Sequence, residues 1–439
     1  MKVMKFGGTS VGRPHRMHHV ADLVTRDAEK KIVVLSAVSG TTNALVEIGN
    51  LLALGKREAA KERIDMLERE YVSFTEGLVQ TPEARQQSAD VLREHFEFLN
   101  IILKISYSEA LSKDILAQGE LLSTRLFSVY LSERGTDHVL LPALDFMTID
   151  MNDEPDVDVI RGKLEKLLQQ HHGAGIFVTQ GYICRNARGE VDNLKRGGSD
   201  YSASLIAAAV RATVCEIWTD ISGMHNNDPR IVDRTVPVGQ LSFDEAAELA
   251  YFGAKILHPA SIWPAQLYKV PVKLLNTMEP QDPGTLIAEE ASSEGVKAVA
   301  AKDGITAINI KSSRMLLAYG FLRKVFEVFE KYRTSIDMIT TSEVAVSVTI
   351  DNAAALHHIV RELETFSTVS VDREQSIVCI VGNRIAAHAG TLHRVFESLA
   401  GIDVRMVSYG GSEHNISILV DGAQKRQVLQ QLNTGLFGL

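Results

Sequence analysis

Short apolar runs alternate with amphipathic segments from the start of the chain. The first apolar run covers residues 3–6, and in the segment that follows, 14–30, apolar residues recur at helical spacing. A second apolar run at 31–36 precedes a second helical pattern at 42–54. This alternation of strands and helices predicts an α/β domain whose mainly parallel sheet is covered by helices on both faces.

A long stretch at about 55–134 has helical periodicity and contains no strand candidate. The pattern predicts three helices there, at about 59–76, 82–103 and 113–134. Further strand candidates lie at 138–144, 175–179, 215–219 and 270–275, and helices are predicted at 201–211 and 242–256. Turn-forming Pro, Gly and Ser residues cluster at 280–295, so we expect one domain over 1–290 with a helical insertion at 55–134.

The remainder of the chain contains an internal repeat with an offset of 70 residues. Gly320 matches Gly390, and the Val-Phe-Glu triplet at 325–327 matches the same triplet at 395–397. Each copy has the pattern strand, helix, strand, strand, helix. We therefore predict two consecutive α+β units of the ferredoxin-like type, at 296–370 and 371–439.

The composition narrows the class of protein. The 439 residues include 46 Lys and Arg against 55 Asp and Glu, and the resulting net charge of −9 argues against nucleic acid or an anionic membrane as the main partner. No apolar run approaches the ~20 residues that span a bilayer, and the N-terminus does not have the pattern of a secretory signal. The three Cys residues are widely spaced and predict no disulfide framework, so we expect a cytoplasmic protein.

Two glycine-rich turns precede predicted helices. Gly7 and Gly8 follow the first strand next to Lys5, and a second Gly pair at 197–198 follows Arg196. Backbone N–H groups of such turns and the positive end of a helix suit an anion. Ser199 and Asp200 of the second turn occupy positions typical of an N-cap. The alternative for these two residues is therefore that they only cap the helix.

Two further segments carry a cation close to a strand or helix end. Thr219 ends the strand predicted at 215–219, Asp220 follows it, and Arg230 comes ten residues later. Lys255 lies at the end of the helix predicted at 242–256. Each segment alone could consist only of loop and helix-capping residues without a binding function. Together with Lys5 and Arg196 they provide four cations in an acidic protein, a pattern that suits a triphosphate.

The order of these motifs resembles the aspartokinases of the amino-acid kinase family. Matching blocks extend over essentially the whole chain, at 5–10, 36–43, 118–120, 179–182, 196–201, 219–223, 228–230 and 253–259. The tandem repeat is similar to the paired ACT domains of those enzymes. The segments 315–322 and 335–343 most resemble the lysine-sensitive, single-function class.

The resemblance implies a three-layer amino-acid-kinase fold followed by two ACT domains. It also implies an ATP-dependent transfer of phosphate to the side-chain carboxylate of L-aspartate, which gives 4-phospho-L-aspartate, the first step towards lysine, methionine and threonine. The acceptor is already an anion, so catalysis should depend on positioning and charge neutralisation rather than on a strong base. Mg²⁺ is expected mainly on phosphate oxygens and water, without a metal site made of protein ligands.

The resemblance also assigns roles to residues of the kinase domain. The residues implied for aspartate are Thr42, Glu120, Tyr182, Arg196 and Ser199. The residues implied for catalysis are Lys5, Asp200 and Lys255, with Asp200 orienting Lys5 or the substrate ammonium. The residues implied for ATP are Lys5, Gly7, Gly8, Thr219, Asp220, His225, Arg230, Lys255 and Ile256. His225 stands where the family commonly has Tyr, and its imidazole can still stack or hydrogen-bond.

The first ACT-like unit is expected to bind lysine as a feedback inhibitor. The implied allosteric residues are Met315, Ala318, Phe321, Leu322, Asp337, Ser342 and Glu343. Asp337 and Glu343 suit the two ammonium groups of lysine. The second unit lacks the Thr-Thr-Ser-Glu run of 340–343 and is expected to shape a homodimer interface; the alternative is that both repeats only dimerise the enzyme.

Two other functions remain open on the sequence. One is a different enzyme of the same superfamily, with glutamate, acetylglutamate or carbamate as the acceptor. The other is an amino-acid sensor whose kinase domain no longer turns over. A fused homoserine dehydrogenase is not expected, because the chain ends after the second repeat.

Overall fold

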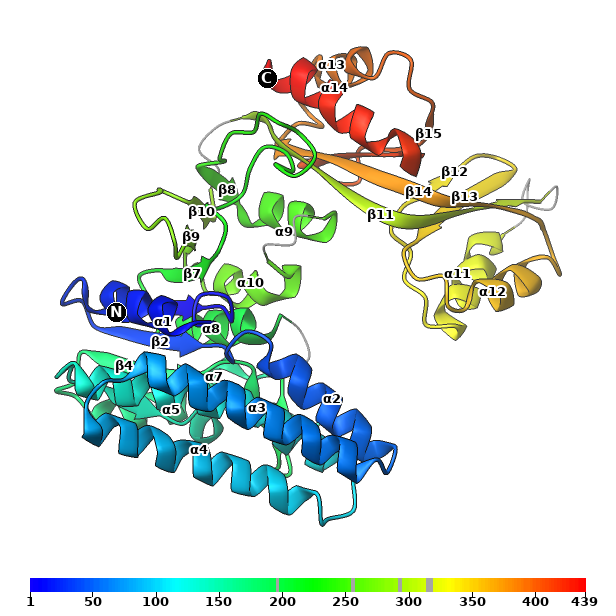
Figure 1. Ribbon diagram of the computed structural model, residues 1–439. Coiled ribbons are helices and arrows are strands. Elements are labelled where there is room, and N and C mark those ends of the chain that lie inside the picture. Colours follow the sequence, from blue (N-terminus) through cyan, green and yellow to red (C-terminus); the bar gives the residue numbers. More distant parts are fainter. Residues whose placement is uncertain (195–196, 254–256, 291–293, 313–318) are drawn as a thin grey trace. The chain divides into compact units, whose positions relative to one another are not determined.

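The computed structural model describes residues 1–194, 197–253, 257–290, 294–312 and 319–439 (Figure 1). The chain forms two compact units, Met1–Met224 with Ile256–Glu290, and His225–Lys255 with Ala291–Leu439. The second unit includes residues 225–255, which the sequence assigns to the kinase domain, and the predicted domain boundaries stay predictions.

A mainly parallel sheet forms the centre of the first unit, as predicted. Its strands are β1 (Lys2–Phe6), β2 (Lys31–Leu35), β3 (Val139–Leu141), β4 (Ile176–Gln180), β7 (Cys215–Thr219), β9 (Val272–Asn276) and β10 (Thr285–Ala288). Their order within this unit is β3-β4-β2-β1-β7-β9-β10. The neighbouring strands from β3 to β9 run parallel, and β10 is antiparallel to β9. The predicted strand at 138–144 ends early, because Pro142 caps the short helix α6 (Ala143–Phe146).

One face of this sheet is covered by two helices from the first part of the chain and by the three helices of the insertion. They are α1 (Pro14–Thr25), α2 (Thr41–Ala53), α3 (Arg57–Leu78), α4 (Pro82–Ile102) and α5 (Glu109–Glu133). Their apolar residues pack with Met4 and Phe6 of β1 in one core. Figure 1 shows α3 and α4 as long neighbouring helices. The three helices predicted at 55–134 are therefore confirmed.

The opposite face carries α7 (Val157–Gln170), α8 (Gly198–Ala209) and α10 (Pro259–Leu267). Side chains alternate along a strand, so Lys5 points to this side while Met4 and Phe6 point to the other. The hairpin of β5 (Ile183–Arg185) and β6 (Val191–Asn193) lies just before α8 in the sequence.

The second unit contains one six-stranded antiparallel sheet to which both repeats contribute. The first repeat consists of β11 (Gly295–Lys311), α11 (Phe321–Lys331), β12 (Ile339–Thr341), β13 (Ala345–Ile350) and α12 (Leu356–Leu363). The second consists of β14 (Thr368–Asn383), α13 (Thr391–Ser398), β15 (Val404–Ser408), β16 (Asn415–Asp421) and α14 (Lys425–Phe437). The sheet order is β12-β13-β11-β14-β16-β15. Each repeat thus has the predicted order of strands and helices.

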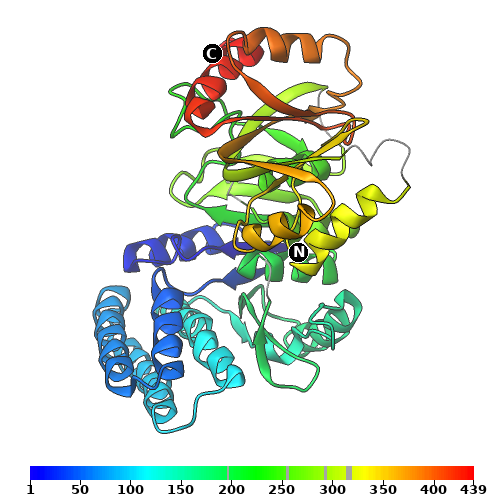
Figure 2. The same ribbon diagram turned by 90° about the vertical axis from the view of Figure 1, so that its right-hand side faces the viewer.

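The two repeats keep separate hydrophobic cores although they share a sheet. One core joins β11 and β13 to α11 and α12, and the other joins β14 and β16 to α13 and α14. The two helix pairs lie well apart in both views (Figures 1 and 2). The matched glycines Gly320 and Gly390 cap α11 and α13 at φ 83° and 88°, a left-handed conformation that favours glycine.

The segment 225–255 also belongs to this unit and contains β8 (Gln240–Ser242) and α9 (Phe243–Tyr251). The helix predicted at 242–256 ends at Tyr251. Three buried asparagines connect this segment to α14. The amide nitrogen of Asn226 donates to Oδ1 of Asn433 at 3.0 Å, that of Asn227 donates to the Leu429 carbonyl at 3.1 Å, and that of Asn433 donates to the Arg234 carbonyl at 2.9 Å.

No helix among the described residues is both long and apolar enough to cross a membrane.

Candidate active site

An ion pair joins the first strand to the helix after the second glycine turn. Lys5 lies near the carboxyl end of β1, and its Nζ is 2.7 Å from Oδ1 of Asp200 in the first turn of α8. Both side chains are largely buried. The structure therefore brings together two of the residues that the resemblance implies for catalysis, in the arrangement expected if Asp200 orients Lys5.

The helix α8 begins at Gly198, three residues before the predicted start at Tyr201. Gly197 occupies the N-cap with φ 63°, and no side chain caps the helix. Ser199 and Asp200 are thus part of the first turn, and the alternative in which they act only as caps is wrong. The hydroxyl of Ser199 instead accepts a hydrogen bond from the Ser36 hydroxyl at 2.9 Å.

A hollow of about 420 Å³ opens between the two glycine turns and α5. Its lining includes Gly8, Thr42, Glu120, Tyr182 and Ser199, all of which the sequence assigned to ATP or aspartate. The other lining residues are Thr9, Ser36, Ala37, Val38, Ser39, Gly40 and Gly198.

The hydroxyl and backbone groups of 36–40 were not predicted individually as site residues. These residues follow the carboxyl end of β2, and the edge at which parallel strands end is where α/β sheets bind ligands. The run Ser-Ala-Val-Ser-Gly directly after a buried strand was the signal that could have identified them.

Glu120 is an acid in the lining of this hollow and is buried, with 4% of its surface exposed. Its Oε1 accepts a hydrogen bond from the Ala37 backbone N–H at 3.3 Å, while Oε2 is buried without a hydrogen-bond partner among the described residues. Burial raises the pKa of Glu120 to about 8. An unpartnered carboxylate oxygen in a pocket is suited to an ammonium group, which would supply both charge and hydrogen bonds.

Close packing of α5 against the loop 36–40 explains the glycine before Glu120. A Cβ atom on Gly119 would lie 2.8 Å from the Cβ of Ala37, which is closer than such atoms approach. Only glycine therefore allows α5 to bring Glu120 to the Ala37 backbone. Ser123, one turn further along α5, donates a hydrogen bond to the Ser36 carbonyl at 2.7 Å and fixes the same loop.

The residues predicted at the end of β7 lie beside the first glycine turn. β1 and β7 are neighbours with Phe6 opposite Trp218, and the Gly7 N–H donates to the Trp218 carbonyl at 3.3 Å. Thr219 and Asp220 follow directly, and the Thr219 hydroxyl donates to Oδ1 of Asp220 at 3.2 Å. The two segments therefore end at the same edge of the sheet.

The remaining residues predicted for the active site are not among the described residues of the first unit. Arg196, Lys255 and Ile256 lie outside the described residues. His225 and Arg230 belong to the second unit, where Nδ1 of His225 is 2.9 Å from the Thr235 hydroxyl. The convergence of four cations on a triphosphate thus stays a prediction.

Arg230 itself forms a two-pronged ion pair. Its Nε and Nη2 atoms lie 2.9 and 2.7 Å from the two carboxylate oxygens of Asp228, and its side chain is 76% exposed. The guanidinium is therefore held at the surface of its unit by a neighbouring acid. Its predicted role in ATP binding is untested.

The predicted allosteric residues lie in the first repeat. Met315 and Ala318 are outside the described part of the chain. Phe321 and Leu322 begin α11, Asp337 immediately precedes the buried Met338, and Ser342 and Glu343 are exposed in the turn between β12 and β13. Their role in binding lysine stays a prediction.

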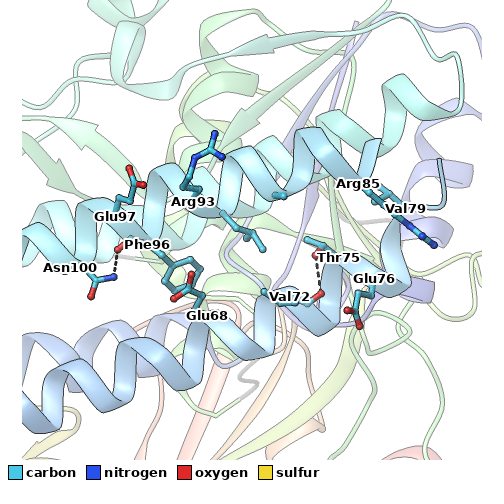
Figure 3. Close-up of a pocket in the computed structure, with 12 residues that line it drawn as sticks. Glu68, Val72, Thr75, Glu76, Val79, Arg85, Arg93, Phe96, Glu97 and Asn100 are labelled. Carbon is cyan, nitrogen blue, oxygen red and sulfur yellow. Dashed lines mark hydrogen bonds between the residues drawn. The ribbon is translucent and has the colours of Figure 1, made fainter. Parts of the chain in front are cut away.

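A second hollow, of about 440 Å³, lies between α3 and α4 (Figure 3). Charged side chains such as Glu68, Arg93 and Glu97 surround the apolar Val72 and Phe96. It contains no glycine turn and none of the predicted site residues. Of these two hollows, the one around Glu120 is therefore the better candidate for phosphoryl transfer.

Comparison with protein families supports both parts of this description. Residues 1–276 match the model of the amino acid kinase family, and residues 378–436 match a model of the ACT domain. The first match covers more than half of the chain.

Individual relatives align over the full length. The chain is 34% identical to the lysine-sensitive aspartokinase 3 of Escherichia coli, over 99% of both sequences. It is also 34% identical to the chloroplastic aspartokinase 1 of Arabidopsis thaliana, over 99% of this chain and 80% of the other.

Two solved structures of E. coli aspartokinase III are similar throughout. The complex with aspartate and ADP has a TM-score of 0.84 at 33% identity, over 100% of both chains. The complex with lysine and aspartate has a TM-score of 0.82 at 33% identity, over 100% of this chain and 99% of the other.

Proposed function

The chain belongs to the aspartokinases of the amino-acid kinase family and is an aspartate kinase, and from this premise we propose how its own residues perform and regulate the reaction. The reaction transfers the terminal phosphoryl group of ATP to the side-chain carboxylate of L-aspartate. Supporting evidence for an ATP site is the ADP in the related E. coli complex.

Glu120 receives the α-ammonium of aspartate. The observation that carries this assignment is the buried Oε2 oxygen, which lines the hollow and has no described hydrogen-bond partner. The hydroxyls of Thr42, Ser36 and Ser39 line the same hollow and can hydrogen-bond the substrate carboxylates. Arg196, although outside the described residues, provides the cation expected for the α-carboxylate.

Lys5 neutralises the charge that builds up when one anion approaches another. Its ammonium is held by Asp200 in the first turn of α8, and the N-terminus of a helix also favours an anion. The nucleophile is a carboxylate, so no proton has to be removed from it. Catalysis then depends on positioning and electrostatic stabilisation, the usual source of rate in phosphoryl transfer.

Mg²⁺ is expected to accompany ATP. Mg²⁺ prefers oxygen ligands and keeps several of its waters, so its ligands are expected to be mainly phosphate oxygens and water. When bound, the ion would neutralise charge on the phosphates. Asp220 and Asp200, at the edge of the sheet, are the acids available to its water ligands.

The assignment of Glu120 is tested by Glu120→Gln. We expect the KM for aspartate to rise about tenfold to a hundredfold, because a charge-assisted hydrogen bond contributes ~1.5–3 kcal/mol. ADP release would be measured with aspartate, glutamate, acetylglutamate and carbamate as acceptors. Glu109→Gln, an exposed position at the start of the same helix, is the matched control. An unchanged KM in Glu120→Gln would contradict the assignment.

Feedback inhibition by lysine through the first repeat completes the proposal. It is supported by the E. coli complex that contains lysine and aspartate, and by the position of Asp337, Ser342 and Glu343 in one repeat. We also propose a cytoplasmic homodimer formed through the ACT domains. Initial rates with lysine, threonine and methionine, together with light scattering, test the inhibitor and the oligomer.

A further inference from the structure

The acid that is proposed to hold lysine belongs to a cluster of four side chains. The cluster consists of Tyr251 at the end of α9, Lys302 on β11, Asp337 before β12 and Asp351 after β13; it is called the Asp337 cluster below. Nζ of Lys302 lies 2.9 Å from Oδ1 of Asp337 and 2.9 Å from Oδ2 of Asp351. The hydroxyl of Tyr251 donates to the same Oδ1 of Asp337 at 2.8 Å.

The geometry of this cluster is that of a bound ammonium ion. The Asp337 side chain is only 1% exposed, and Nζ of Lys302 also lies over the Tyr251 ring, 4.5 Å from its centroid. A cation between carboxylates and an aromatic face is a recurrent way to bind an ammonium group. Burial lowers the pKa of Lys302, but the ion pairs with Asp351 and Asp337 outweigh it and raise the pKa overall.

One of the two carboxylate oxygens of Asp337 can accept a further hydrogen bond. Its Oδ2 is buried and has no hydrogen-bond partner among the described residues. A buried carboxylate oxygen without a donor is costly, so Asp337 is prepared for a further cationic group. A second ammonium at Oδ2 would be repelled by the like charge of Lys302 on Oδ1, which favours displacement of Lys302.

We propose that Lys302 is a built-in competitor of the effector lysine, whose ammonium takes the place of the Lys302 ammonium on Asp337. This inference rests on the proposed inhibition by lysine. Displacement of Lys302 also disturbs its contact with Tyr251, and the effector competes with the Tyr251 hydroxyl for Asp337. Tyr251 is the last residue of α9 and precedes Lys255 by four positions in the sequence.

The Lys302 side chain, as the competitor, raises the lysine concentration that is needed for half-inhibition. By linkage, every contact that lysine must break weakens its apparent affinity by the free energy of that contact. Removal of the Lys302 charge therefore makes lysine bind more tightly, the opposite of what loss of a ligand-binding residue does. This opposite sign distinguishes a competitor from a residue that merely lines the site.

The test compares lysine binding by calorimetry and half-inhibiting concentrations in the full-length protein. For Lys302→Met we expect the Kd for lysine and the half-inhibiting concentration to fall about tenfold, equivalent to about 1.4 kcal/mol. Lys302→Arg restores a cation and should return both values towards those of the wild type. Lys331→Met, which removes an exposed ion pair with Glu362 in the same repeat, should leave both unchanged.

Tyr251→Phe provides a second, milder variant should Lys302→Met fold poorly. It removes only the hydroxyl that donates to Asp337, and we expect the Kd for lysine to fall about threefold, equivalent to about 0.7 kcal/mol. A wild-type protein that phosphorylates aspartate but does not bind lysine would overturn the proposed regulation and this inference together. Lysine inhibition of equal strength in the wild type, Lys302→Met and Tyr251→Phe would overturn the inference alone.

Discussion

Glu120 links the burial of one side chain to the pH dependence of the reaction. Its pKa is raised to about 8 by burial, so the carboxyl group is mainly protonated at neutral pH before aspartate binds. The α-ammonium of aspartate favours the ionised form. Binding therefore releases a proton from Glu120.

We expect the affinity for aspartate to increase as the pH rises from 6.5 to about 8 and to level off above that value. Below the pKa of the free site, each pH unit changes the population of the ionised form up to about tenfold. The KM for aspartate measured across this range checks the expectation. Glu120→Gln should remove the slope and Glu109→Gln should keep it; a slope that survives in Glu120→Gln would rule out this carboxyl group as its source.

The contribution of Glu120 to the free energy of unfolding changes with pH in the opposite direction to that of an ordinary ion-paired acid. The folded protein retains a proton on Glu120 that the unfolded chain loses near its ordinary pKa of 4.5. Folding is therefore favoured by this group below about pH 4.5, and that contribution is lost as the pH rises from 4.5 through 8.

At the scale of the element, the approach of α5 to the loop 36–40 determines the geometry of the pocket. Gly119→Ala places a Cβ 2.8 Å from the Cβ of Ala37, so helix and loop must separate. We expect the free energy of unfolding to fall by about 1–3 kcal/mol and the KM for aspartate to rise, because Glu120 moves with the helix. Urea unfolding and initial rates measure the two effects.

Gly49→Ala is the matched control within α2. The nearest atom to its new Cβ would be the Ser112 hydroxyl oxygen at 3.9 Å, an ordinary contact. Alanine is a better helix former than glycine by ~1 kcal/mol, so this variant should be as stable as the wild type or more so. Equal effects of the two substitutions would argue against the close approach at Gly119.

The elements themselves could largely be predicted from the sequence, because buried strands such as β1, β2 and β7 are short apolar runs. The helix α7 was not predicted: it buries only Val157, Ile160 and Leu164, and its other apolar residues lie at exposed or half-buried positions. The contacts that complete the pocket, such as Ser36 with Ser199, join residues that are 163 positions apart. No local pattern encodes such a pairing, so the hydroxyls around the substrate were found only in three dimensions.

At the scale of the whole molecule, the asparagines of 226–227 and α14 show that the second unit is held together by buried polar contacts. Asn433→Ala removes the acceptor of the Asn226 amide and leaves the Arg234 carbonyl without its donor. We expect the free energy of unfolding to fall by about 1–3 kcal/mol, the cost of burying unsatisfied polar groups. Gln430→Ala, exposed on the same helix, should change it little, and a comparable loss in both variants would contradict this account.

The same contacts have a consequence for protein engineering. A chimera that exchanges the regulatory half at residue 290 would pair the foreign last helix with Asn226 and Asn227, whose amides need partners at fixed places. Transplanting the sensitivity of one enzyme to another therefore requires moving residues 225–255 together with the repeats. The better exchange point therefore lies before residue 225, within residues 1–276, which match the amino acid kinase family.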